Sequence, residues 1–407
     1  MKLELERQNF LKAWQTAEKI SATKTTKESI SGILITADEN NTVTLTATNL
    51  QTSVKCTAEG ANVLAPGVAL VPAAFLGSMM RKTNAEDLVL DVDEKRGLLI
   101  AGSSKTRFAV VPVGEFPNIP ESSSAELICE IQSMDLSRLI NEGGSAASQP
   151  QDFPKYMGTC LLRTEDEYIK IVSTDGKRLA SSRCICSVSK ADDLLLPAPA
   201  LKELGKTIAA YSEKNIKIFA DDSTAWFTLE GVEFSIRKID AAFPKYERIL
   251  NKDVRTTLRA SCGELSSVLD RVDIVAKTTP AHIMAIILQP GNGEVRITAR
   301  APEVGTANET LYATVEGSNM QIGFNVGYFQ DGLKVLAAGD VVIEFSDEEG
   351  QARMFKSESD DFLYMLMPAR LSSQDAMTEE EIGDFNPDAP EYQEVQQEQQ
   401  PEQPEAF

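Results

Sequence analysis

The sequence contains a single histidine, His282, among its 407 residues. Because histidine is the usual acid–base group near neutral pH and a common zinc ligand, most histidine-based catalysis and most zinc sites are excluded. His282 stands in "TTPAHIMAIIL", where we expect it at the edge of a strand rather than in a catalytic site. The single histidine therefore narrows the catalytic and zinc chemistry that the chain can carry.

Cysteine is also scarce and scattered. Only Cys184 and Cys186 lie close together in the sequence, and a strand would place both on one face. No second pair and no histidine lies near them, so we expect buried free thiols in a reducing cytosol. The six cysteines are Cys56, Cys129, Cys160, Cys184, Cys186 and Cys262.

Long apolar runs are absent. No stretch of eighteen apolar residues occurs, and the start, "MKLELERQNFLKAWQ", has no apolar core of the kind that signal peptides carry. We therefore expect a cytoplasmic protein with no membrane partner.

Positive charge is in deficit, with Lys+Arg 40 against Asp+Glu 61 and a net charge of −21. This charge balance argues against a protein that binds nucleic acid over its whole surface, but it allows a local basic patch. Residues 372–407 hold eleven acidic residues and no lysine or arginine, and Gln, Glu and Pro dominate there. Such a segment buries too little apolar surface to order itself, so we expect a disordered acidic tail.

What the sequence does contain is an internal repeat. "VPAAFL" begins at Val71, "LPAPAL" at Leu196 and "FNVGYF" at Phe324, with offsets of 125 and 128 residues. "FPNIP" at Phe116 and "FPKYE" at Phe243 lie 127 residues apart. A fixed period of this length indicates repeated structural units.

Each unit shows two segments with helical periodicity and several with strand alternation. In residues 7–20, Phe10, Trp14 and Ala17 form one stripe, and Lys12 and Lys19 form another. The expected helices are residues 7–20, 73–82, 133–144, 199–208, 261–272 and 327–336.

Local signals support these elements. Ser261 and Glu264 have the spacing of a capping box at a helix start. Hairpin turns are expected around Asn40-Asn41, Glu165-Asp166 and Gly291–Gly293.

The fold class is therefore α+β, with three tandem copies of one module of about 125 residues. Each module should hold two amphipathic helices and about eight short strands. The expected divisions are residues 1–124, 125–252, 253–371 and the tail 372–407.

One turn distinguishes the second module. The segment "IVSTDGKRLASS", residues 171–182, contains Gly176-Lys177-Arg178. It lacks the first glycine and the hydroxyl residue of a phosphate-binding loop, and no dinucleotide fingerprint is present. The turn position repeats in the other modules as "LTATNLQTSV" and "ITARAPEVGT", but Gly-Lys-Arg-Leu occurs only in the second. A bare hairpin turn remains possible, and a docking function local to this module is the alternative.

Three motifs together resemble one family, the bacterial DNA polymerase III beta subunit, the sliding clamp. They are "STDGKRLA" at 173–180, "FPKYERIL" at 243–250 and "LYMLMPARL" at 363–371, joined by "VPAAFL" and "NVGYF" at matching repeat positions. The resemblance covers residues 1–371 in order. No single motif is specific, whereas the combination is.

The resemblance implies a non-enzymatic processivity factor with no catalytic residues, no metal and no cofactor. It would be a head-to-tail homodimer ring of six modules around duplex DNA. Strands would form the outer surface and helices would line the hole, where basic side chains meet phosphates without reading sequence. The candidate DNA-binding residues are Lys12, Lys19, Lys24, Lys27, Arg81, Lys82, Arg138, Gln151, Lys155, Tyr156, Lys202, Lys206, Arg271 and Lys334.

The resemblance also implies a cleft between modules two and three for short peptides of the DNA polymerase III alpha subunit, other polymerases and the clamp loader complex. Methionines there would let the pocket repack around different partners. The candidate cleft residues are Met157, Thr174, Gly176, Lys177, Arg178, Leu179, Pro244, Arg248, Ile249, Met365, Met367, Pro368, Ala369 and Arg370.

The chain departs from common family members at three positions. Lys177 stands where histidine is frequent and Ala369 where a larger apolar residue is frequent, which puts the width of the pocket in question. Thr25 stands where an arginine is often found, between Lys24 and Lys27, which puts individual DNA contacts in question.

For the dimer seam, the resemblance points to Phe108 and Val110 of one chain against Ile274 and Val275 of the other. An apolar patch of this kind would be costly to expose on a monomer, which favours an interface. A plain core role for these residues is the alternative.

Two other functions stay open from the residues alone. One is a carboxylate–metal phosphotransfer enzyme, with candidate acids Asp91, Asp93 and Glu94, or Asp221 and Asp222, all at expected turns. The other is an acidic, strand-rich scaffold with no role on DNA.

Overall fold

The structure is a computed structural model that describes residues 1–23, 25–211, 214–250, 253–291, 293–336, 339–347, 351–356, 361–372 and 376. The chain forms two compact units, Met1–Asn251 with Glu358–Met365, and Lys252–Ser357 with Leu366–Phe407. Lys24 and nearly all of the expected acidic tail lie outside the described residues.

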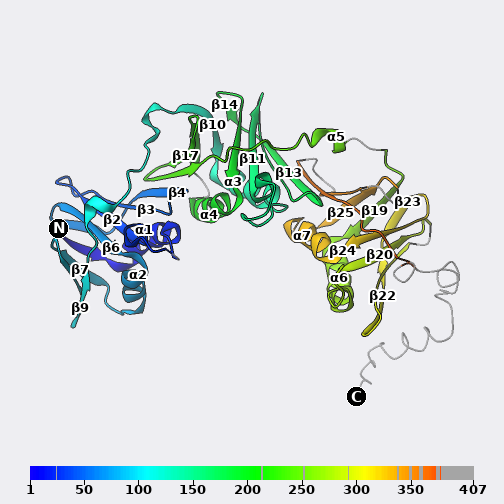
Figure 1. Ribbon diagram of the computed structural model, residues 1–407, viewed down its shortest axis with the longest axis horizontal. Coiled ribbons are helices and arrows are strands. Elements are labelled where there is room, and N and C mark those ends of the chain that lie inside the picture. The colour runs from blue at the N-terminus through cyan, green and yellow to red at the C-terminus, as the bar shows by residue number, and fades with distance from the viewer. Residues whose placement is uncertain are drawn as a thin grey trace, which may run out of the picture. The chain divides into compact units, whose positions relative to one another are not determined.

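The described chain repeats one order of elements three times: strand, helix, five strands, helix, three strands (Figure 1). The first repeat is β1 (Lys2–Glu6), α1 (Arg7–Ile20), β2 (Gly32–Ala37), β3 (Val43–Thr48), β4 (Thr52–Thr57), β5 (Ala61–Ala65), β6 (Gly67–Pro72), α2 (Ala73–Lys82), β7 (Asp87–Val92), β8 (Arg96–Ala101) and β9 (Ser104–Ala109).

The second repeat is β10 (Glu126–Gln132), α3 (Ser133–Gly143), β11 (Thr159–Glu165), β12 (Tyr168–Thr174), β13 (Arg178–Ile185), β14 (Ser187–Val188), β15 (Asp192–Pro197), α4 (Ala198–Ile208), β16 (Asn215–Ala220), β17 (Thr224–Leu229) and β18 (Val232–Arg237). A short helix, α5 (Glu247–Leu250), follows it.

The third repeat is β19 (Thr256–Ser261), α6 (Cys262–Ala276), β20 (Ile283–Leu288), β21 (Glu294–Ala301), β22 (Gly305–Tyr312), β23 (Thr314–Gly317), β24 (Met320–Asn325), α7 (Val326–Leu336), β25 (Asp340–Phe345), β26 (Ala352–Lys356) and β27 (Phe362–Leu366). The predicted threefold repeat is confirmed, with nine described strands in each copy instead of about eight.

The six expected helices are present because their apolar residues recur at helical spacing. In α1, Phe10, Trp14 and Ala17 are fully buried, while Lys12 and Lys19 are exposed. Helix α6 begins as expected but continues to Ala276. The predicted capping box is wrong, because Ser261 stands at the N-cap position without a side-chain capping hydrogen bond.

Three sheets build the first unit. One has the order β5-β1-β7-β8-β9, and a second has the order β14-β10-β16-β17-β18-β4-β3-β2-β6. The second joins two repeats, because β18 pairs with β4 from Val232↔Cys56 to Ile236↔Thr52. The third runs β15-β11-β12-β13-β27, so β27 lies beside strands of the second repeat.

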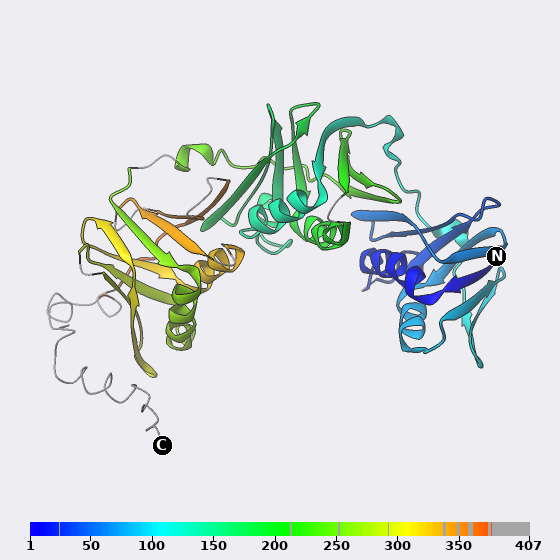
Figure 2. The same ribbon diagram turned by 180° about the vertical axis from the view of Figure 1, so that it is seen from behind.

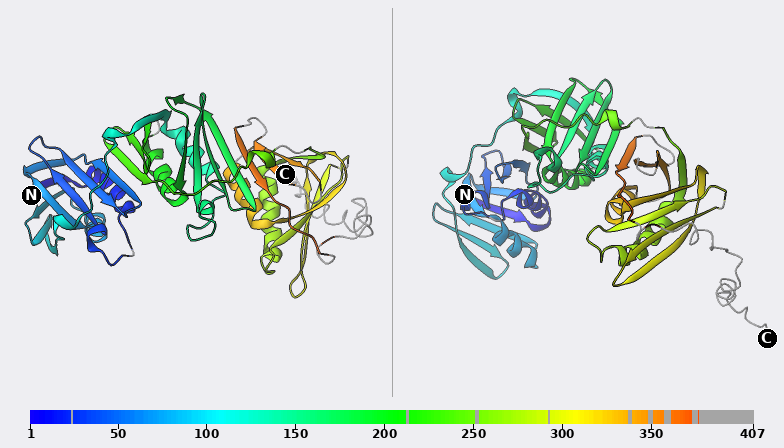
Figure 3. Two further views of the ribbon diagram at one scale, coloured as in Figure 1. Left: turned by 45° about the horizontal axis from the view of Figure 1, so that its top comes forward. Right: turned by 45° about the vertical axis from the view of Figure 1, so that its right-hand side comes forward.

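Helices cover these sheets in pairs. Helix α1 packs on α2, and α3 lies beside α4, as the view from behind also shows (Figure 2). In the second unit, β23, β19, β25 and β26 form one sheet segment, and β22-β21-β20-β24 form another sheet. Helices α6 and α7 lie side by side there (Figure 3). No helix within the described ranges has the length and apolar character needed to cross a membrane.

The expected hairpin turns are confirmed. Asn41 has φ 63 between β2 and β3, Asp166 has φ 51 between β11 and β12, and Gly291 has φ 90 between β20 and β21. These positive φ values suit glycine, asparagine and aspartate. Of the acids expected at turns, Asp91 is an exception because it lies inside β7.

All six cysteines are free, as expected, but two are not buried: Cys184 and Cys186 are half-buried. Strand β13 ends at Ile185, so only Cys184 of the pair lies in a strand.

Candidate functional site

The turn that distinguishes the second repeat connects β12 to β13. The Asp175 carboxylate accepts the backbone N–H of Lys177 at 2.9 Å and of Arg178 at 3.0 Å. The Thr174 hydroxyl accepts the Gly176 N–H at 3.1 Å. Gly176 has φ 83, a backbone conformation that residues other than Gly, Asn and Asp rarely adopt. Side-chain caps and glycine therefore fix the backbone of this turn.

Arg178 is held rather than left in solvent. Its Nε donates to Asp175 Oδ2 at 2.9 Å, and a guanidinium N–H donates to the Tyr364 hydroxyl at 3.2 Å. The two charged side chains are 11% and 10% exposed. A charge pair so far out of water is geometrically well defined, so the Arg178 side chain is held in one position.

Beneath this turn lies an apolar cluster separate from the main core of the unit. We call it the satellite cluster: Leu161, Val172, Leu179, Leu195, Tyr246 and Met365, with Ile239, Ala241, Phe243 and Leu250 partly buried against it. Leu179 and Met365 were predicted as cleft residues from the sequence. Leu161, Val172 and Leu195 were missed because apolar strand residues look like any other core. Tyr246, in the turn before α5, was also missed although it lies inside the motif "FPKYERIL".

Aromatic rings line one side of the satellite cluster. The rings of Tyr156 and Phe243 are 6.0 Å apart, and those of Phe243 and Tyr246 are 6.1 Å apart, both edge to face. The Tyr246 hydroxyl is buried and has no hydrogen-bond partner among the described residues. Burial raises its pKa to about 12.

An ion-pair group positions α5 over the cluster. Arg163 of β11 donates to both carboxylate oxygens of Asp193 at 2.7 and 2.8 Å, and to Glu247 at 2.8 Å. The hydrogen bond to Asp193 is the largest cause of the raised pKa of Arg163. Because Glu247 opens α5, this contact ties the short helix to the sheet.

The remaining predicted cleft residues divide between the units. In the first unit, Met157 and Pro244 are half-buried, Lys177 and Arg248 are exposed, and Ile249 is 39% exposed. In the second unit, Met367 is 44% exposed, and the Ala369 N–H donates to the Gly323 carbonyl at 2.8 Å. Pro368 is half-buried and Arg370 is exposed beside them in the sequence.

Two residues that fix the site were missed by sequence reasoning. Asp175 and Tyr364 both lie inside the quoted motifs but were not chosen as site residues. The signal available for Asp175 was its position before a glycine turn, where aspartate often caps the backbone. No sequence pattern predicts the hydrogen bond between Arg178 and Tyr364.

Eight of the predicted DNA-binding residues divide by whether they form an ion pair within the protein. Five are already paired in the protein: Arg81 with Glu18, Arg138 with Asp135 and Glu142, Lys206 with Glu203, Arg271 with Glu309, and Lys334 with Asp331. By contrast, Lys19, Lys82 and Lys202 are exposed and make no ion pair within 4 Å among the described residues.

Of the others, Lys12 lies on α1, whereas Lys27, Gln151, Lys155 and Tyr156 lie outside the α-helices and strands. Lys12 donates to Asn9 at 3.1 Å, and the backbone of Lys27 donates to the Thr25 hydroxyl at 3.0 Å. Gln151 and Lys155 are exposed. Tyr156 is half-buried because its ring packs on Phe243.

The predicted seam residues differ in exposure. Phe108 is buried in the core of the first unit, with its ring 6.4 Å from that of Phe75, and Val110 packs partly against that core. On α6, Ile274 is 58% exposed and Val275 is half-buried. Strand β9 is an edge strand of one sheet and β22 is an edge strand of another, so both carry unpaired backbone groups.

His282 is placed as expected, directly before β20, where its Nε2 lies against the Asp273 carboxylate of α6. The acids of the alternative metal site are engaged elsewhere: Asp91 pairs with Lys2 at 3.5 Å, and Asp93 and Asp221 cap their own turns. Within the described part of the chain, no group of three or more His, Cys, Asp or Glu side chains could hold a metal ion.

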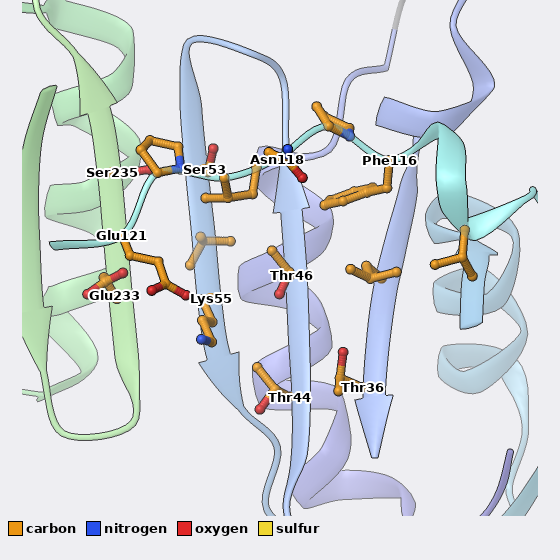
Figure 4. A pocket seen from close by; sticks show the side chains of 16 residues that line it. Thr36, Thr44, Thr46, Ser53, Lys55, Phe116, Asn118, Glu121, Glu233 and Ser235 are labelled. Atoms are coloured by element: carbon orange, nitrogen blue, oxygen red, sulfur yellow. The ribbon is translucent and has the colours of Figure 1, made fainter. Parts of the chain in front are cut away.

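A hollow of about 460 Å³ lies elsewhere in the first unit, where the segment Phe116–Glu121 crosses β2, β3 and β4 (Figure 4). Threonine side chains line its floor, including Thr36, Thr44 and Thr46, while Lys55, Glu121 and Glu233 gather at one end. None of the predicted cleft or DNA-binding residues lines it.

Three repeats of one strand-and-helix module, with an aspartate-capped turn beside an apolar cluster in the second, define a protein of the DNA-clamp class. Family descriptions match in order along the chain: DNA polymerase III beta subunit N-terminal domain at residues 1–120, central domain at 130–245 and C-terminal domain at 247–370. The chain belongs to the DNA polymerase III beta subunit family.

Individual relatives agree with this assignment. The chain is 28% identical over 374 residues to a beta sliding clamp of Pseudomonas putida, and 26% identical over 377 residues to that of Escherichia coli K12. Each match covers 91% of this chain and 100% of the relative.

Solved structures agree as well. The DNA polymerase III subunit beta from Pseudomonas aeruginosa has a TM-score of 0.84 at 25% identity. The beta subunit from Thermotoga maritima has a TM-score of 0.85 at 22% identity, a likeness of fold. Both comparisons cover 91% of this chain and 100% of the other.

Proposed function

We propose that the protein is a non-enzymatic sliding clamp, a ring-shaped processivity factor that encircles duplex DNA without reading its sequence. The observation that carries this is the match of all three family domains, in order, to relatives named beta sliding clamp over their full length. Weak phosphate contacts would let the ring move, and closure around the duplex would keep it bound.

The test uses closed circular and linear DNA of one sequence. The protein is loaded by its clamp loader, and protein that comigrates with DNA in gel filtration is measured. A clamp remains with the circle and is lost from the open ends of the linear form. Equal retention on both forms contradicts a clamp, and metal-dependent hydrolysis by the purified protein would favour the phosphotransfer enzyme instead.

The second part of the proposed function is partner docking. Peptides of the DNA polymerase III alpha subunit, of other polymerases and of the clamp loader would bind over the satellite cluster and the Arg178 turn. Support comes from a cluster that stands apart from the main core, with a fixed guanidinium beside it. A relative from Pseudomonas aeruginosa was solved bound to griselimycin.

The substitution Ile249→Asp tests docking. Ile249 is 39% exposed, so a carboxylate there costs little folding stability but places charge where an apolar peptide anchor would sit. We expect the affinity for an apolar, extended polymerase peptide to fall at least about tenfold in fluorescence anisotropy. Leu64→Asp is the matched control, since Leu64 is 48% exposed on β5 and is outside the satellite cluster. Equal affinity of both variants argues against this docking site.

The third part is a homodimer. We propose that β9 of one chain meets β22 of the other, with Phe108 and Val110 against Ile274 and Val275. Two sheet edges and an exposed isoleucine support this. The solution mass should be about twice the 44.4 kDa of one chain, and Ile274→Asp should shift it toward the monomer while Leu64→Asp does not. A monomeric wild-type protein would contradict the proposed ring.

The acidic segment 372–407 has a proposed role as well. It begins directly after Arg370 and Leu371, and its charge would repel DNA or cover the docking site. Removing residues 372–407 should then change peptide affinity or loading on DNA. Unchanged values for both would leave the segment as a spacer. The location we propose is the bacterial cytoplasm, at the nucleoid.

A further inference from the structure

Helix α6 carries the exposed seam residue Ile274 on its last turn. Val272 and Ala276 are buried beneath the helix, so Ile274, two residues from each, lies on the opposite face, where it is 58% exposed. Because successive residues of an α-helix are about 100° apart, Arg271 and Asp273 lie on the two flanks between these faces. Contacts on both flanks would set the rotation of the helix about its axis, and with it the direction of Ile274.

Both flanks are tied to strands of the same unit. Helix α6 packs on β21 and β22, and on one flank the Arg271 Nε donates to Glu309 Oε2 of β22 at 2.8 Å. On the other flank, Asp273 Oδ1 lies 2.5 Å from Nε2 of His282, which directly precedes β20. Because an ionised carboxylate can only accept, the His282 Nε2–H donates this hydrogen bond. The two links therefore join α6 to the sheet β22-β21-β20-β24 from opposite sides.

His282 adopts an unfavourable backbone conformation. Its φ of 54 lies in the left-handed region, which glycine adopts freely and other residues rarely. This conformation is fixed on both sides, since the His282 N–H donates to the Thr279 carbonyl at 3.2 Å and the His282 carbonyl accepts the Val326 N–H at 3.0 Å. Glycine would fit the same backbone without strain. A strained residue of this kind points to a role for its side chain, and that side chain contacts Asp273.

The surroundings of the imidazole ring hold it in this contact. Lys277, also on α6, places its Nζ 4.0 Å from Asp273 Oδ2, the carboxylate oxygen that His282 does not use. On the other side of the ring, a Cβ added to Gly327 of α7 would lie 3.3 Å from the His282 Cε1 and 3.6 Å from its Nδ1. The ring is thus confined between α6 and α7, with 28% of the side chain exposed.

We propose that His282 is a positioning residue of the dimer seam. Through Asp273 it fixes the rotation of the last turn of α6, and so directs Ile274 toward the partner, a second copy of this chain. The proposal rests on the homodimer proposed above. It gives the single histidine of the chain a role in assembly rather than in catalysis.

His282→Gly separates positioning from folding. Glycine relieves the left-handed backbone, so the thermal stability of the variant should stay close to the wild-type value although a hydrogen bond is lost. The dimer should nevertheless weaken, with a dissociation constant about fivefold higher or more in sedimentation equilibrium of the full chain. A histidine with only a structural role would show the opposite pattern, a lower stability and an unchanged dimer.

Asn41→Gly is the matched control in the other unit. Asn41 also has a positive φ, 63, and its side chain accepts the Val63 N–H at 2.6 Å. The substitution therefore removes the same two features, a strained backbone and a side-chain hydrogen bond, from a turn that holds none of the predicted seam residues. It should leave the dissociation constant of the dimer unchanged.

Two substitutions of Asp273 test the contact itself. Asp273→Asn keeps an oxygen that can accept the His282 Nε2–H, so this variant should dimerise as the wild type does. Asp273→Ala should weaken the dimer as His282→Gly does. Combining Asp273→Ala with His282→Gly should add nothing further, because both changes remove the same contact.

The outcomes separate this proposal from the homodimer on which it rests. A dimeric wild type with unchanged dissociation constants in His282→Gly and Asp273→Ala would overturn the positioning role alone. So would fully additive effects of these two substitutions, or an Asp273→Asn dimer as weak as that of Asp273→Ala. A monomeric wild type would refute the homodimer itself, and the positioning role with it.

Discussion

At the scale of single residues, one local hydrogen-bond pattern occurs in three turns of the first unit. An aspartate accepts backbone N–H groups two and three residues ahead: Asp93 before β8, Asp175 before β13 and Asp221 before β17. Only Asp175 also holds a nearly buried arginine, Arg178. The turn with a proposed docking role thus differs from its equivalents by one ion pair.

This difference can be measured with Asp175→Ala. The substitution removes two backbone hydrogen bonds and takes the carboxylate from Arg178, so we expect a loss of about 3 kcal/mol in unfolding free energy. Asp221→Ala is the control, since it removes the same turn hydrogen bonds without a buried arginine, and it should cost about 1 kcal/mol. Denaturant unfolding of both variants checks this; equal losses would mean that the Arg178 pair adds nothing.

Tyr246 leads to a prediction with a pH dependence. Its hydroxyl has no partner among the described residues, so Tyr246→Phe should leave stability unchanged or raise it by up to about 1 kcal/mol. Tyr364→Phe is the control, because it removes the hydrogen bond with Arg178 and should lose about 1 kcal/mol.

The pKa of Tyr246 is raised to about 12 from an ordinary value of 10.0. This shift determines how folding stability changes at alkaline pH. The folded state favours the neutral form of Tyr246. The contribution of this residue to folding stability is therefore complete below pH 10 and is lost as pH rises toward about 12. Urea unfolding across this range should show a steeper loss for the wild type than for Tyr246→Phe. Identical slopes would contradict the buried environment of the hydroxyl.

Residue-scale prediction from the sequence succeeded where the role is local. The glycine turn at Gly176 and the buried stripe of Phe10, Trp14 and Ala17 follow from backbone and helical geometry. The position of Cys129 opposite Val188 could not be predicted, because it depends on which strand β14 pairs with. The contact of Tyr364 with Arg178 has the same origin.

At the scale of elements, the helices were predicted to within a residue or a few, since a 3.6-residue apolar period is a strong local signal. The sheets were not. Residues of β4 and β18 pair across the first two repeats, and β27 lies beside β13 although it ends the third. Strand alternation says which face is buried but not which strand is the neighbour.

The packing of α1 on α2 gives an element-scale prediction. A Cβ on Gly77 would lie 2.7 Å from Glu18 Oε1 and 2.8 Å from Trp14 Nε1, closer than real contacts. Gly77→Ala should therefore destabilise the first unit by about 2 kcal/mol, although alanine is the better helix former.

Gly263→Ala in α6 is the matched control. The nearest atom to its added Cβ is Ser261 Oγ at 3.9 Å, so helix propensity alone should act and stability should rise by up to about 1 kcal/mol. Thermal unfolding of the two variants should move in opposite directions. A stabilising Gly77→Ala would contradict the close helix contact.

At the scale of the whole molecule, a net charge of −21 coexists with basic side chains on the helices. Several of these are neutralised within the protein, such as Arg81 by Glu18 and Arg271 by Glu309. Lys19, Lys82 and Lys202 carry no such partner among the described residues. We therefore expect the DNA contacts to be few and weak, so that persistence depends on ring closure.

The most direct test of this account is the dissociation rate from a loaded DNA circle, measured between about 50 and 200 mM salt, before and after a single cut. We predict slow loss that is nearly independent of salt on the intact circle, and rapid loss once the circle is cut. A dissociation rate that rises steeply with salt and is the same before and after the cut would contradict this account. It would show that contact affinity, not encirclement, holds the protein on DNA.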